Sequence, residues 1–479
     1  MKYNDIRGDY MEKFVDRTKE LETLEKEFCR EESSFVVVYG RRRVGKTALI
    51  NHFCKGKNAI YFLATEEGEN ENRENFKNIV GNHFDNTLLL NASVNRWEDI
   101  FSVVQNRENP SERLILVIDE FQYLGKANKS FPSVMMGIWD KILCKSNVML
   151  ILCGSLINMM TSQVLNYDSP LYGRRTAQIK LKQIAFKYYH EFDESYSEEQ
   201  QIERFAVTGG VPKYVELFES DTDIYEAIRK NVLSRNAFLY AEPEFLLQKE
   251  VSEIGSYFSI LKVIAGGQHK LGKIATALNQ PQTSLSKYLS VLTDLDLLER
   301  QVPITEENPE KSKMGLYFIK DNFIKFWFQF VYPYRSLLEA DRDEFVISKI
   351  KQSFIENHVS YVYEDICREK IWDFLGDKCT FNRVGRWWGN RDIEIDIVAY
   401  DSVGTDILFG ECKYSKNPKG MDVLEALKEK ANSVTWNKEF RKEYFCIFSK
   451  NGFSPALEEY AKQHENIILA SLKMPHENC

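Results

Sequence analysis

The sequence predicts an α/β protein built from more than one domain. In the N-terminal half, short runs of almost wholly apolar residues alternate with segments of helical length. This alternation is typical of the buried strands of a parallel sheet and of the helices that cover it. A second alternation of strand-like and helix-like segments begins near residue 350. The length of 479 residues agrees with both observations, because one domain usually holds about 100–200 residues.

The composition excludes several classes of protein. Hydrophobic residues make up 43% of the chain, which is enough for several cores and excludes disorder as its main state. The net charge of −8 excludes a protein that coats nucleic acid through its overall charge, so a DNA contact would need a local basic patch. No run of 18 apolar residues occurs and no apolar signal segment opens the chain, so we expect no membrane span. The nine cysteines are scattered without a C-x-x-C pair, which favours reduced thiols and a cytoplasmic location.

Four apolar runs predict strands in the first part of the chain. They lie at residues 34–39, 59–63, 114–118 and 148–153 and are rich in Val, Ile, Leu and aromatic residues. Each run is short and is separated from the next by helix-length segments, so we expect the strands to pair in parallel. We assign residues 1–185 to this α/β core.

A phosphate-binding motif follows the first of these strands. Residues 40–47, Gly-Arg-Arg-Arg-Val-Gly-Lys-Thr, match the pattern G-x-x-x-x-G-K-[ST] between a strand and a helix. Gly40 and Gly45 allow the backbone to curl its N–H groups around an anion. Lys46 would reach the β- and γ-phosphates of ATP, and Thr47 would offer its hydroxyl to Mg²⁺. The predicted nucleotide-binding residues are Gly40, Arg41, Arg42, Arg43, Val44, Gly45, Lys46, Thr47 and Ala48.

Two adjacent carboxylates follow the apolar run at residues 114–118. Asp119 is predicted to hold Mg²⁺ together with Thr47, and Glu120 to polarise the attacking water. Two acids at the tip of an apolar strand are otherwise costly or merely exposed to solvent. The alternative is a strand that simply ends in a charged turn. Gln122 fits either a residue that orients water or an ordinary surface residue.

Polar residues after the fourth strand suggest further contacts to phosphate. Ser155 follows residues 148–153 and is predicted to sense the bound phosphate, with a turn serine as the alternative. Arg174 and Arg175 come later in the chain, and an arginine there would stabilise the transferring phosphate. Ion pairs on a helix surface are the alternative for these two arginines.

Several short motifs follow one another along this region of the chain. They are Phe14-Val15-Asp16-Arg17, residues 40–47, Asp119-Glu120-Phe121-Gln122, Gly154-Ser155, Leu171-Tyr172-Gly173-Arg174 and Gly209-Gly210-Val211-Pro212. Over residues 12–240 they resemble the archaeal-type ATPase family, which belongs to the AAA+/STAND group of P-loop ATPases. The resemblance implies ATP hydrolysis or ATP-dependent switching, a helical lid at residues 186–245, and a place for Arg17 near the adenine.

Three short helices and a hairpin are predicted over residues 246–320. The helices lie at 257–265, 270–277 and 282–295, and the strands of the hairpin at 300–304 and 314–319. This order is the winged-helix pattern. The third helix carries few of the Arg, Asn and Gln side chains that read DNA bases, so DNA binding and a contact to a domain or protein both stay open.

A strongly aromatic segment follows the hairpin. Asp321–Pro333 contains phenylalanine, tryptophan and tyrosine at close intervals. Such a segment more often packs between domains than binds a ligand. We therefore expect a buried helix there, as part of a linker at residues 321–350.

A cluster of acids and a lysine is predicted in the last domain, residues 351–479. Asp396 lies on an alternating strand, and Glu411 and Lys413 lie two residues apart on the next strand, so the pair shares one face. Acids that hold Mg²⁺ beside a lysine suit phosphodiester hydrolysis, with Glu364 on the preceding helix as a third acid. With the element order helix, three strands, helix, strand, helix, strand, the cluster resembles the PD-(D/E)XK restriction-endonuclease-like nucleases. A ladder of exposed ion pairs and a catalytically silent relative of these nucleases are the alternatives.

Basic and aromatic residues come just before the acidic strand. They are Arg386-Trp387-Trp388-Gly389 and Arg391. This mixture fits a path for nucleic acid, and it also fits a pair of tryptophans packed in the core.

Two functions follow from these observations. The first is an ATP-hydrolysing P-loop ATPase, with ATP and Mg²⁺ as cofactors, whose winged-helix and nuclease-like domains act on DNA. The second is a non-catalytic nucleotide-dependent switch that binds a protein or DNA partner, with the nuclease-like domain inactive. A homo-oligomer or a protein partner is compatible with both, and no membrane is expected in either.

Overall fold

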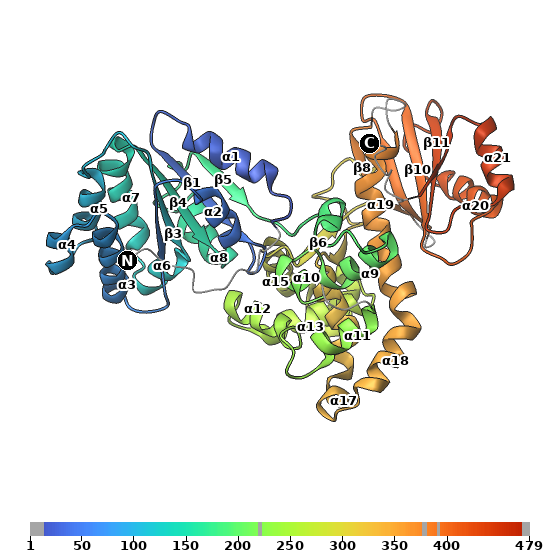
Figure 1. Ribbon diagram of the computed structural model, residues 1–479. Coiled ribbons are helices and arrows are strands. Elements are labelled where there is room, and N and C mark those ends of the chain that lie inside the picture. The colour runs from blue at the N-terminus through green and yellow to red at the C-terminus, as the bar shows by residue number, and fades with distance from the viewer. Residues whose placement is uncertain (1–13, 219–222, 376–380, 390–392, 472–479) are drawn as a thin grey trace. The chain divides into compact units, whose positions relative to one another are not determined.

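The computed structural model describes residues 14–218, 223–375, 381–389 and 393–471 (Figure 1). Contacts within the chain group these residues into two compact units. Unit 1 is drawn from Met1–Phe192, Val211–Glu216 and Leu246–Ser252, and unit 2 from Asp193–Gly210, Leu217–Phe245 and Glu253–Cys479. Within the described ranges, no helix has both the length and the apolar character needed to span a membrane.

Unit 1 contains a five-stranded parallel sheet with the strand order β2-β3-β4-β1-β5. The predicted parallel sheet is therefore confirmed. A fifth strand, which the sequence did not predict, pairs with the first at the edge of the sheet. The strands are β1 (Ser34–Tyr39), β2 (Ala59–Leu63), β3 (Leu114–Asp119), β4 (Val148–Gly154) and β5 (Ala177–Lys180).

Both faces of this sheet are buried, which explains why its strands are apolar throughout. In β1, Phe35 and Val37 pack into the core on one face, while Val36 and Val38 pack into the core on the other. Helices α1 and α2 cover the second face, and α3, α5 and α7 cover the first (Figure 1). The helical segments of unit 1 are α1 (Thr18–Phe28), α2 (Lys46–Cys54), α3 (Glu69–His83), α4 (Thr87–Asn91), α5 (Trp97–Gln105), α6 (Gln122–Ala127), α7 (Phe131–Lys141), η1 (Leu143–Lys145), α8 (Ile157–Met160), η2 (Thr161–Leu165), η3 (Phe186–Glu191) and α10 (Pro212–Glu216).

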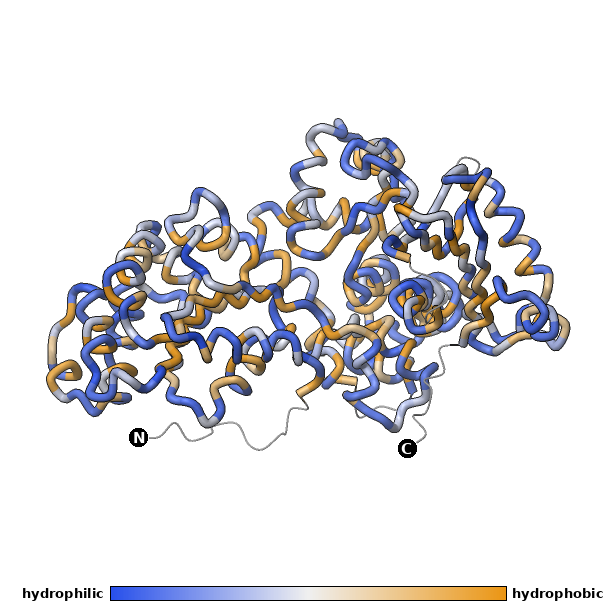
Figure 2. Tube along the Cα trace, turned by 90° about the horizontal axis from the view of Figure 1, so that it is seen from above, coloured by the Kyte–Doolittle hydropathy of each residue, from blue (hydrophilic) through white to orange (hydrophobic). Residues whose placement is uncertain are grey.

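Unit 2 begins with helices and the predicted hairpin. Three helices followed by two antiparallel strands occur in the predicted order, although the first strand starts two residues before the predicted 300–304 and ends at Gln301. The winged-helix assignment itself stays a prediction. Hydrophobic and hydrophilic residues alternate along many of the helices (Figure 2), as expected for helices with one buried face. These elements are α9 (Glu198–Thr208), α11 (Ile224–Ile228), η4 (Arg229–Leu233), α12 (Glu242–Glu250, whose last turn belongs to unit 1), α13 (Ile254–Ala265), α14 (Leu271–Leu278), α15 (Gln282–Asp294), β6 (Leu298–Gln301) and β7 (Leu316–Ile319).

The aromatic segment is buried as expected, but it is not one regular helix. A short α-helix gives way to a wider π-helical turn, and then to a 3₁₀ turn around Pro333. Proline has no N–H to continue the α-helical ladder, which accounts for the change at that residue. The segments from here to the last domain are α16 (Asn322–Phe326), η5 (Trp327–Val331), η6 (Tyr332–Tyr334), α17 (Arg335–Glu339), α18 (Asp343–Phe354), η7 (Ile355–Val359) and α19 (Ser360–Leu375).

A second five-stranded sheet, mixed in direction, closes unit 2. Its strand order is β12-β11-β10-β9-β8, antiparallel from β8 to β10 and parallel from β10 to β12. The element order predicted from the sequence is present. The elements are β8 (Arg383–Trp388), β9 (Glu394–Tyr400), β10 (Asp406–Lys413), α20 (Met421–Ala431), β11 (Lys442–Ser449), α21 (Pro455–Gln463) and β12 (Ile467–Ala470).

The loop of the hairpin between β6 and β7 packs against this sheet. The backbone N–H of Ile304 donates to the carbonyl of Arg386 at 2.9 Å, on edge strand β8. The Tyr400 hydroxyl donates to the carbonyl of Ile304, and the indole N–H of Trp388 donates to the carbonyl of Met314, each at 3.2 Å. The loop thus covers the edge of the sheet and is already engaged within unit 2.

Candidate functional site

The glycine-rich loop joins β1 to α2 as the motif requires. Gly45 precedes α2 with φ of 92°, and Gly40 follows β1 with φ of 153°, both in the region that favours glycine. A Cβ atom at Gly40 would also collide with the backbone carbonyl of Leu181. Only glycine fits at residue 40, so the chain can pass close to its neighbour and turn into the loop.

Lys46 lies under this loop and is almost fully buried. Its ammonium group donates to the carbonyls of Gly40 and Arg41, at 2.9 and 2.8 Å. Burial lowers the pKa of Lys46, while the nearby carboxylates of Glu120 and Asp119 oppose that shift. The loop therefore holds the ammonium group of Lys46 close to the position where the motif binds phosphate.

Thr47 and Asp119 are brought together at the ends of α2 and β3. The Thr47 hydroxyl lies 3.4 Å from Oδ2 of Asp119, and the side chain of Asp119 is buried. The hydroxyl of Tyr61 on β2 donates to the same oxygen, and burial followed by the charge of Asp119 raises the pKa of Tyr61. A hydroxyl and a carboxylate are oxygen ligands that suit Mg²⁺, so these residues fit that ion. Sequence reasoning did not find Tyr61.

Ser155 contacts Glu120. Its hydroxyl lies 2.9 and 2.7 Å from the two carboxylate oxygens of Glu120, and its backbone N–H lies 3.3 Å from Oε2. The side-chain amide of Gln122 donates to Oε2 as well. Glu120 itself has a positive φ of 54°. The predicted water-polarising residue is thus tethered by the predicted sensor and by Gln122.

Arg17 binds the backbone of the phosphate-binding loop. Its guanidinium donates to the carbonyls of Val44 and Lys182, at 2.9 and 2.7 Å, and its side chain is buried. Glu20 lies 3.5 Å from the same guanidinium. These contacts support the loop, while the expected place near the adenine stays a prediction.

The remaining residues of the predicted nucleotide set differ in exposure. Arg42 is half-buried and donates to the hydroxyl of Tyr123 at 2.9 Å. Arg43 has a positive φ of 70°, and burial lowers its pKa. Ala48 is half-buried in the first turn of α2.

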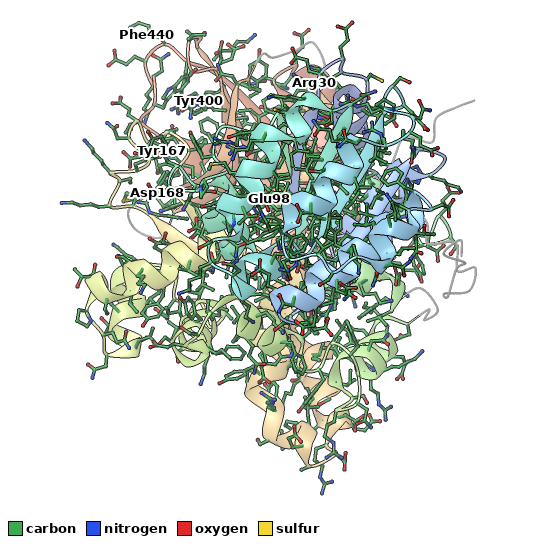
Figure 3. All side chains as sticks on the ribbon, turned by 90° about the vertical axis from the view of Figure 1, so that its left-hand side faces the viewer. Arg30, Glu98, Tyr167, Asp168, Tyr400 and Phe440 are labelled. Carbon is green, nitrogen blue, oxygen red and sulfur yellow. The ribbon has the colours of Figure 1, made fainter. Side chains whose placement is uncertain are left out.

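Arg174 forms an ion pair on a helix surface, which was the alternative to the predicted contact with phosphate. Its guanidinium binds both carboxylate oxygens of Asp140 on α7, at 2.9 and 2.8 Å. Arg175 instead lies 5.5 Å from the ring centre of Tyr172, which packs against the exposed Tyr167. Figure 3 marks Tyr167 on this loop.

The C-terminal cluster gathers its predicted residues around Glu411. Ile397 pairs with Gly410, so Asp396 comes next to the register position of Glu411, and Oδ2 of Asp396 accepts from the N–H of Cys412 at 2.8 Å. Lys413 lies 2.6 Å from Glu411.

A second lysine, Lys430 on α20, binds the same carboxylate. Its ammonium nitrogen lies 3.0 and 2.9 Å from the two oxygens of Glu411. Sequence reasoning missed this residue, because nothing in the pattern of α20 marks it.

The acids of this cluster are strongly perturbed. Burial, followed by the charge of Asp396, raises the pKa of Glu364 to about 8, and Arg386 at 3.2 Å opposes the shift. Burial and Glu411 likewise raise the pKa of Asp396. Across the described ranges, no group of three or more His, Cys, Asp or Glu side chains is placed to hold a metal ion. With Glu411 bound to two lysines, these residues do not fit a resident cation as they stand, and the metal role of Glu364, Asp396 and Glu411 stays a prediction.

The tryptophan pair before this cluster belongs to the core. Trp387 and Trp388 are both buried, and Trp387 packs with the apolar residues of the sheet. Arg391 lies outside the described residues.

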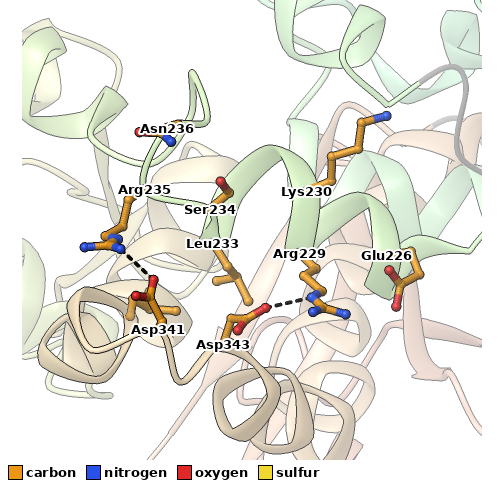
Figure 4. A pocket seen from close by; sticks show the side chains of 10 residues that line it. Glu226, Arg229, Lys230, Leu233, Ser234, Arg235, Asn236, Asp341 and Asp343 are labelled. Carbon is orange, nitrogen blue, oxygen red and sulfur yellow. Dashed lines mark hydrogen bonds and ion pairs between the residues drawn. The ribbon is translucent and has the colours of Figure 1, made fainter.

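A separate hollow of about 400 Å³ lies in unit 2 between η4 and the start of α18 (Figure 4). Arg229 pairs with Asp343 at 2.7 Å, and Arg235 pairs with Asp341 at 2.6 Å. The two ion pairs thus join the helical segments on either side of the hollow.

Two family models match the chain. Residues 14–218 match an ATPase domain described as predominantly from Archaea. Residues 327–431 match a family described as archaeal and bacterial proteins of unknown function. The second match overlaps the predicted nuclease-like domain and assigns it no activity, so the nuclease identity is not confirmed.

Similar proteins agree with the first match. An uncharacterized protein of Methanocaldococcus jannaschii is 33% identical over 442 residues, which cover 91% of this chain and 96% of that protein. An uncharacterized ATP-binding protein of the same organism is 48% identical over 44 residues, which cover 9% of this chain and 75% of that protein. The solved structure of a Walker-type ATPase of Pyrococcus abyssi has the same fold over 68% of this chain and 99% of its own, with 20% identity and a TM-score of 0.53. The chain therefore belongs to the family of proteins that carry this ATPase domain, which is described as predominantly from Archaea, and residues 14–218 are its P-loop ATPase domain.

Proposed function

We propose that the protein binds and hydrolyses ATP at the loop of residues 40–47 and uses that cycle to act on DNA through unit 2. One observation carries the ATPase part of the proposal. The hydroxyl of Thr47 and the carboxylate of Asp119 converge at 3.4 Å beside the buried ammonium of Lys46. The name of the ATP-binding relative in Methanocaldococcus jannaschii also supports it.

Each residue has a separate task in this proposal. Lys46 and the N–H groups of the loop bind the β- and γ-phosphates, and Thr47 and Asp119 would hold Mg²⁺. When bound, Mg²⁺ neutralises charge on the phosphates. Glu120 accepts a proton from the attacking water once Ser155 and Gln122 no longer occupy its oxygens. The tether on Glu120 therefore predicts slow basal hydrolysis.

Two substitutions and a matched control test the ATP site. Lys46→Ala should weaken ATP binding at least a hundredfold in calorimetry, because the site loses the buried ammonium group that would contact the phosphates. Glu120→Gln should bind ATP normally and lose hydrolysis. Lys55→Ala removes an exposed lysine just after α2 and should change neither quantity. Unchanged ATP affinity in Lys46→Ala would refute the site.

The DNA part of the proposal depends on α15. The hairpin loop is engaged with β8, whereas the outer face of α15 is open to a duplex, with Thr283, Ser286 and Lys287 exposed. Duplex binding should weaken steeply as salt rises, because phosphate contacts release counterions. Lys287→Ala should reduce the slope of log affinity against log salt concentration by about 1, because one phosphate contact is lost. An affinity that does not depend on salt would contradict a phosphate contact.

The second candidate is a nucleotide-dependent switch whose C-terminal domain is catalytically inactive. The two lysines on Glu411 favour it, since they occupy the carboxylate that a nuclease would use for a metal ion. The element order and the Asp396, Glu411 and Lys413 pattern support the nuclease instead. Incubation with Mn²⁺ and varied DNA or RNA separates the two, comparing wild type with Asp396→Ala. Cleavage that is lost in the variant supports the nuclease, while equal products or none support the switch.

A further inference from the structure

One segment of unit 1 is connected on both sides to unit 2. Residues 246–252, which include the last turn of α12, belong to unit 1 by their contacts. The chain before and after them, Leu217–Phe245 and Glu253–Cys479, belongs to unit 2. We call residues 246–252 the strap. Any movement of the strap is therefore transmitted through the backbone to both of its flanks.

Glu250 fastens the strap to the end of the parallel sheet. Its carboxylate oxygens accept the backbone N–H groups of Ile157 and Asn158, at 3.0 and 3.4 Å. The side-chain amide of Asn158 returns a bond to the carbonyl of Glu250 at 3.4 Å. Because the two N–H groups open the short helix α8, they have no helical partner of their own.

The residues that Glu250 binds lie two and three positions after Ser155. Ile157 follows Ser155 by two positions, and the hydroxyl of Ser155 holds Glu120 at 2.9 and 2.7 Å. A fixed Ile157–Asn158 turn therefore fixes the direction of the Ser155 side chain. The carboxylate oxygens of Glu120 are in turn occupied by protein donors, Ser155 and Gln122.

The surroundings of Glu250 also include the phosphate-binding loop. Burial raises the pKa of Glu250, and the two N–H bonds together with the charges of Arg42 and Arg41 oppose that shift. Arg42 is itself bound to the hydroxyl of Tyr123. The carboxylate is thus near two cations of the loop and bonded to the turn that follows Ser155.

We propose that Glu250 is a positioning residue of the ATPase site, which keeps Ser155 on Glu120 and so holds hydrolysis at its slow basal rate. This inference rests on the proposed ATPase function. Release of the strap frees Ser155, Glu120 turns to water, and hydrolysis speeds up. Because the strap continues into unit 2 at both ends, an event in unit 2 that moves it acts on Glu120.

Steady-state ATPase kinetics on the full chain test this role. Glu250→Ala removes the acceptor and should raise kcat at least threefold, with the ATP dissociation constant within twofold of wild type. Glu250→Gln keeps an oxygen that accepts the N–H of Ile157 and should return kcat most of the way to wild type. Glu22→Ala removes an exposed carboxylate on α1, outside the strap, and should leave kcat unchanged.

A double-mutant cycle with Ser155→Ala separates positioning from general loosening. If Glu250 acts through Ser155, Glu250→Ala should add little to kcat once Ser155 is gone, because coupled sites are not additive. The inference would be overturned if the effects of Glu250→Ala and Ser155→Ala on kcat multiplied in the double variant. It would also be overturned if Glu250→Ala alone left kcat unchanged or lowered it. Wild-type protein that hydrolyses ATP no faster than Lys46→Ala would instead refute the proposed function, so the two failures are distinguishable.

Discussion

The ammonium nitrogen of Lys430 lies 3.0 and 2.9 Å from the two carboxylate oxygens of Glu411. Lys413 adds a second ammonium at 2.6 Å, and Glu411 is only 6% exposed. Two cations on one buried carboxylate leave it little capacity to bind a third. The C-terminal domain thus brings Asp396 and Glu411 together in an arrangement that opposes metal binding.

Replacement of Lys430 by methionine should therefore tighten the binding of Mn²⁺ to unit 2. We expect an affinity at least tenfold higher than in wild type, because the ion no longer competes with Lys430 for both oxygens. Calorimetry or electron paramagnetic resonance with Mn²⁺ alone gives the readout without any substrate. Lys428→Met is the matched control on the same helix, since Lys428 binds the hydroxyl of Tyr460 instead, at 3.2 Å. Equal Mn²⁺ affinity in wild type and Lys430→Met would disprove the competition.

Tyr61 should set how much Mg²⁺ the ATP site requires. Its hydroxyl donates to Oδ2 of Asp119, the oxygen that also lies 3.4 Å from Thr47. Tyr61→Phe frees that oxygen, so the half-saturating Mg²⁺ concentration for ATP binding should fall two- to threefold. A Mg²⁺ titration at fixed ATP measures it, with the exposed Tyr167→Phe as control. A rise in the Mg²⁺ requirement would mean that Tyr61 supports the site instead.

The sequence predicted the parallel sheet well because its strands are buried on both faces. An all-apolar run such as Val36–Val38 carries that signal in its composition. Strand β5, Ala177–Lys180, was missed because it is short and, of its residues, only Ile179 is fully buried. The π-helical turn at Trp327–Val331 was missed as well, since apolar periodicity does not separate it from an α-helix.

The sequence predicted those residues of the candidate site that lie in a recognisable motif or at the end of a strand. Thr47 and Asp119 could be placed together because parallel strands end at one edge of a sheet. The contacts of Tyr61 with Asp119, of Ser155 with Glu120 and of Lys430 with Glu411 could not be predicted in the same way. Ser155 lies 35 positions from Glu120, and Glu250 lies 93 positions from Ile157. Such contacts depend on how distant segments pack together, and the local sequence pattern does not show this.

Arg17 should contribute to both the stability of unit 1 and its ATP affinity. Its guanidinium donates to the carbonyls of Val44 and Lys182, and a hydrogen bond from a charged donor contributes about 1.5–3 kcal/mol. Arg17→Met should therefore destabilise unit 1 by about 2 kcal/mol and weaken ATP binding about tenfold. Urea unfolding and calorimetry measure the two effects.

A conservative variant and a control define the role of Arg17 further. Arg17→Lys keeps a charge and should restore part of the loss, because lysine reaches one carbonyl but lacks the planar fork. Arg30→Met removes an exposed arginine and should have no effect on either measurement. An ATP affinity that is unchanged in Arg17→Met would show that the loop keeps its shape without this support.

His358 should make unit 2 sensitive to mild acid. Its ring is fully buried against Phe326, Phe330 and Phe354, and its Nε2–H donates to the carbonyl of Ala206 at 2.7 Å. Burial, with a smaller effect from the charge of Lys325, lowers the pKa of His358 to about 3. The unfolded chain takes up a proton near pH 6.5, while the folded protein takes it up only near pH 3. Between these values the unfolded state binds more protons, so acid favours unfolding.

The stability that the neutral ring provides is therefore complete above pH 6.5 and falls as the pH drops toward 3. From pH 6.5 to pH 5 the loss should be about 2 kcal/mol, since each pH unit in this window is worth about 1.4 kcal/mol. His358→Gln keeps an N–H for Ala206 but does not titrate, so its urea midpoint should fall less between pH 7 and pH 5. Tryptophan fluorescence, to which the buried Trp327 of the same unit contributes, reports unfolding. His52→Gln in unit 1 should keep the wild-type pH dependence, and an equal dependence in wild type and His358→Gln would show that His358 is protonated at little cost.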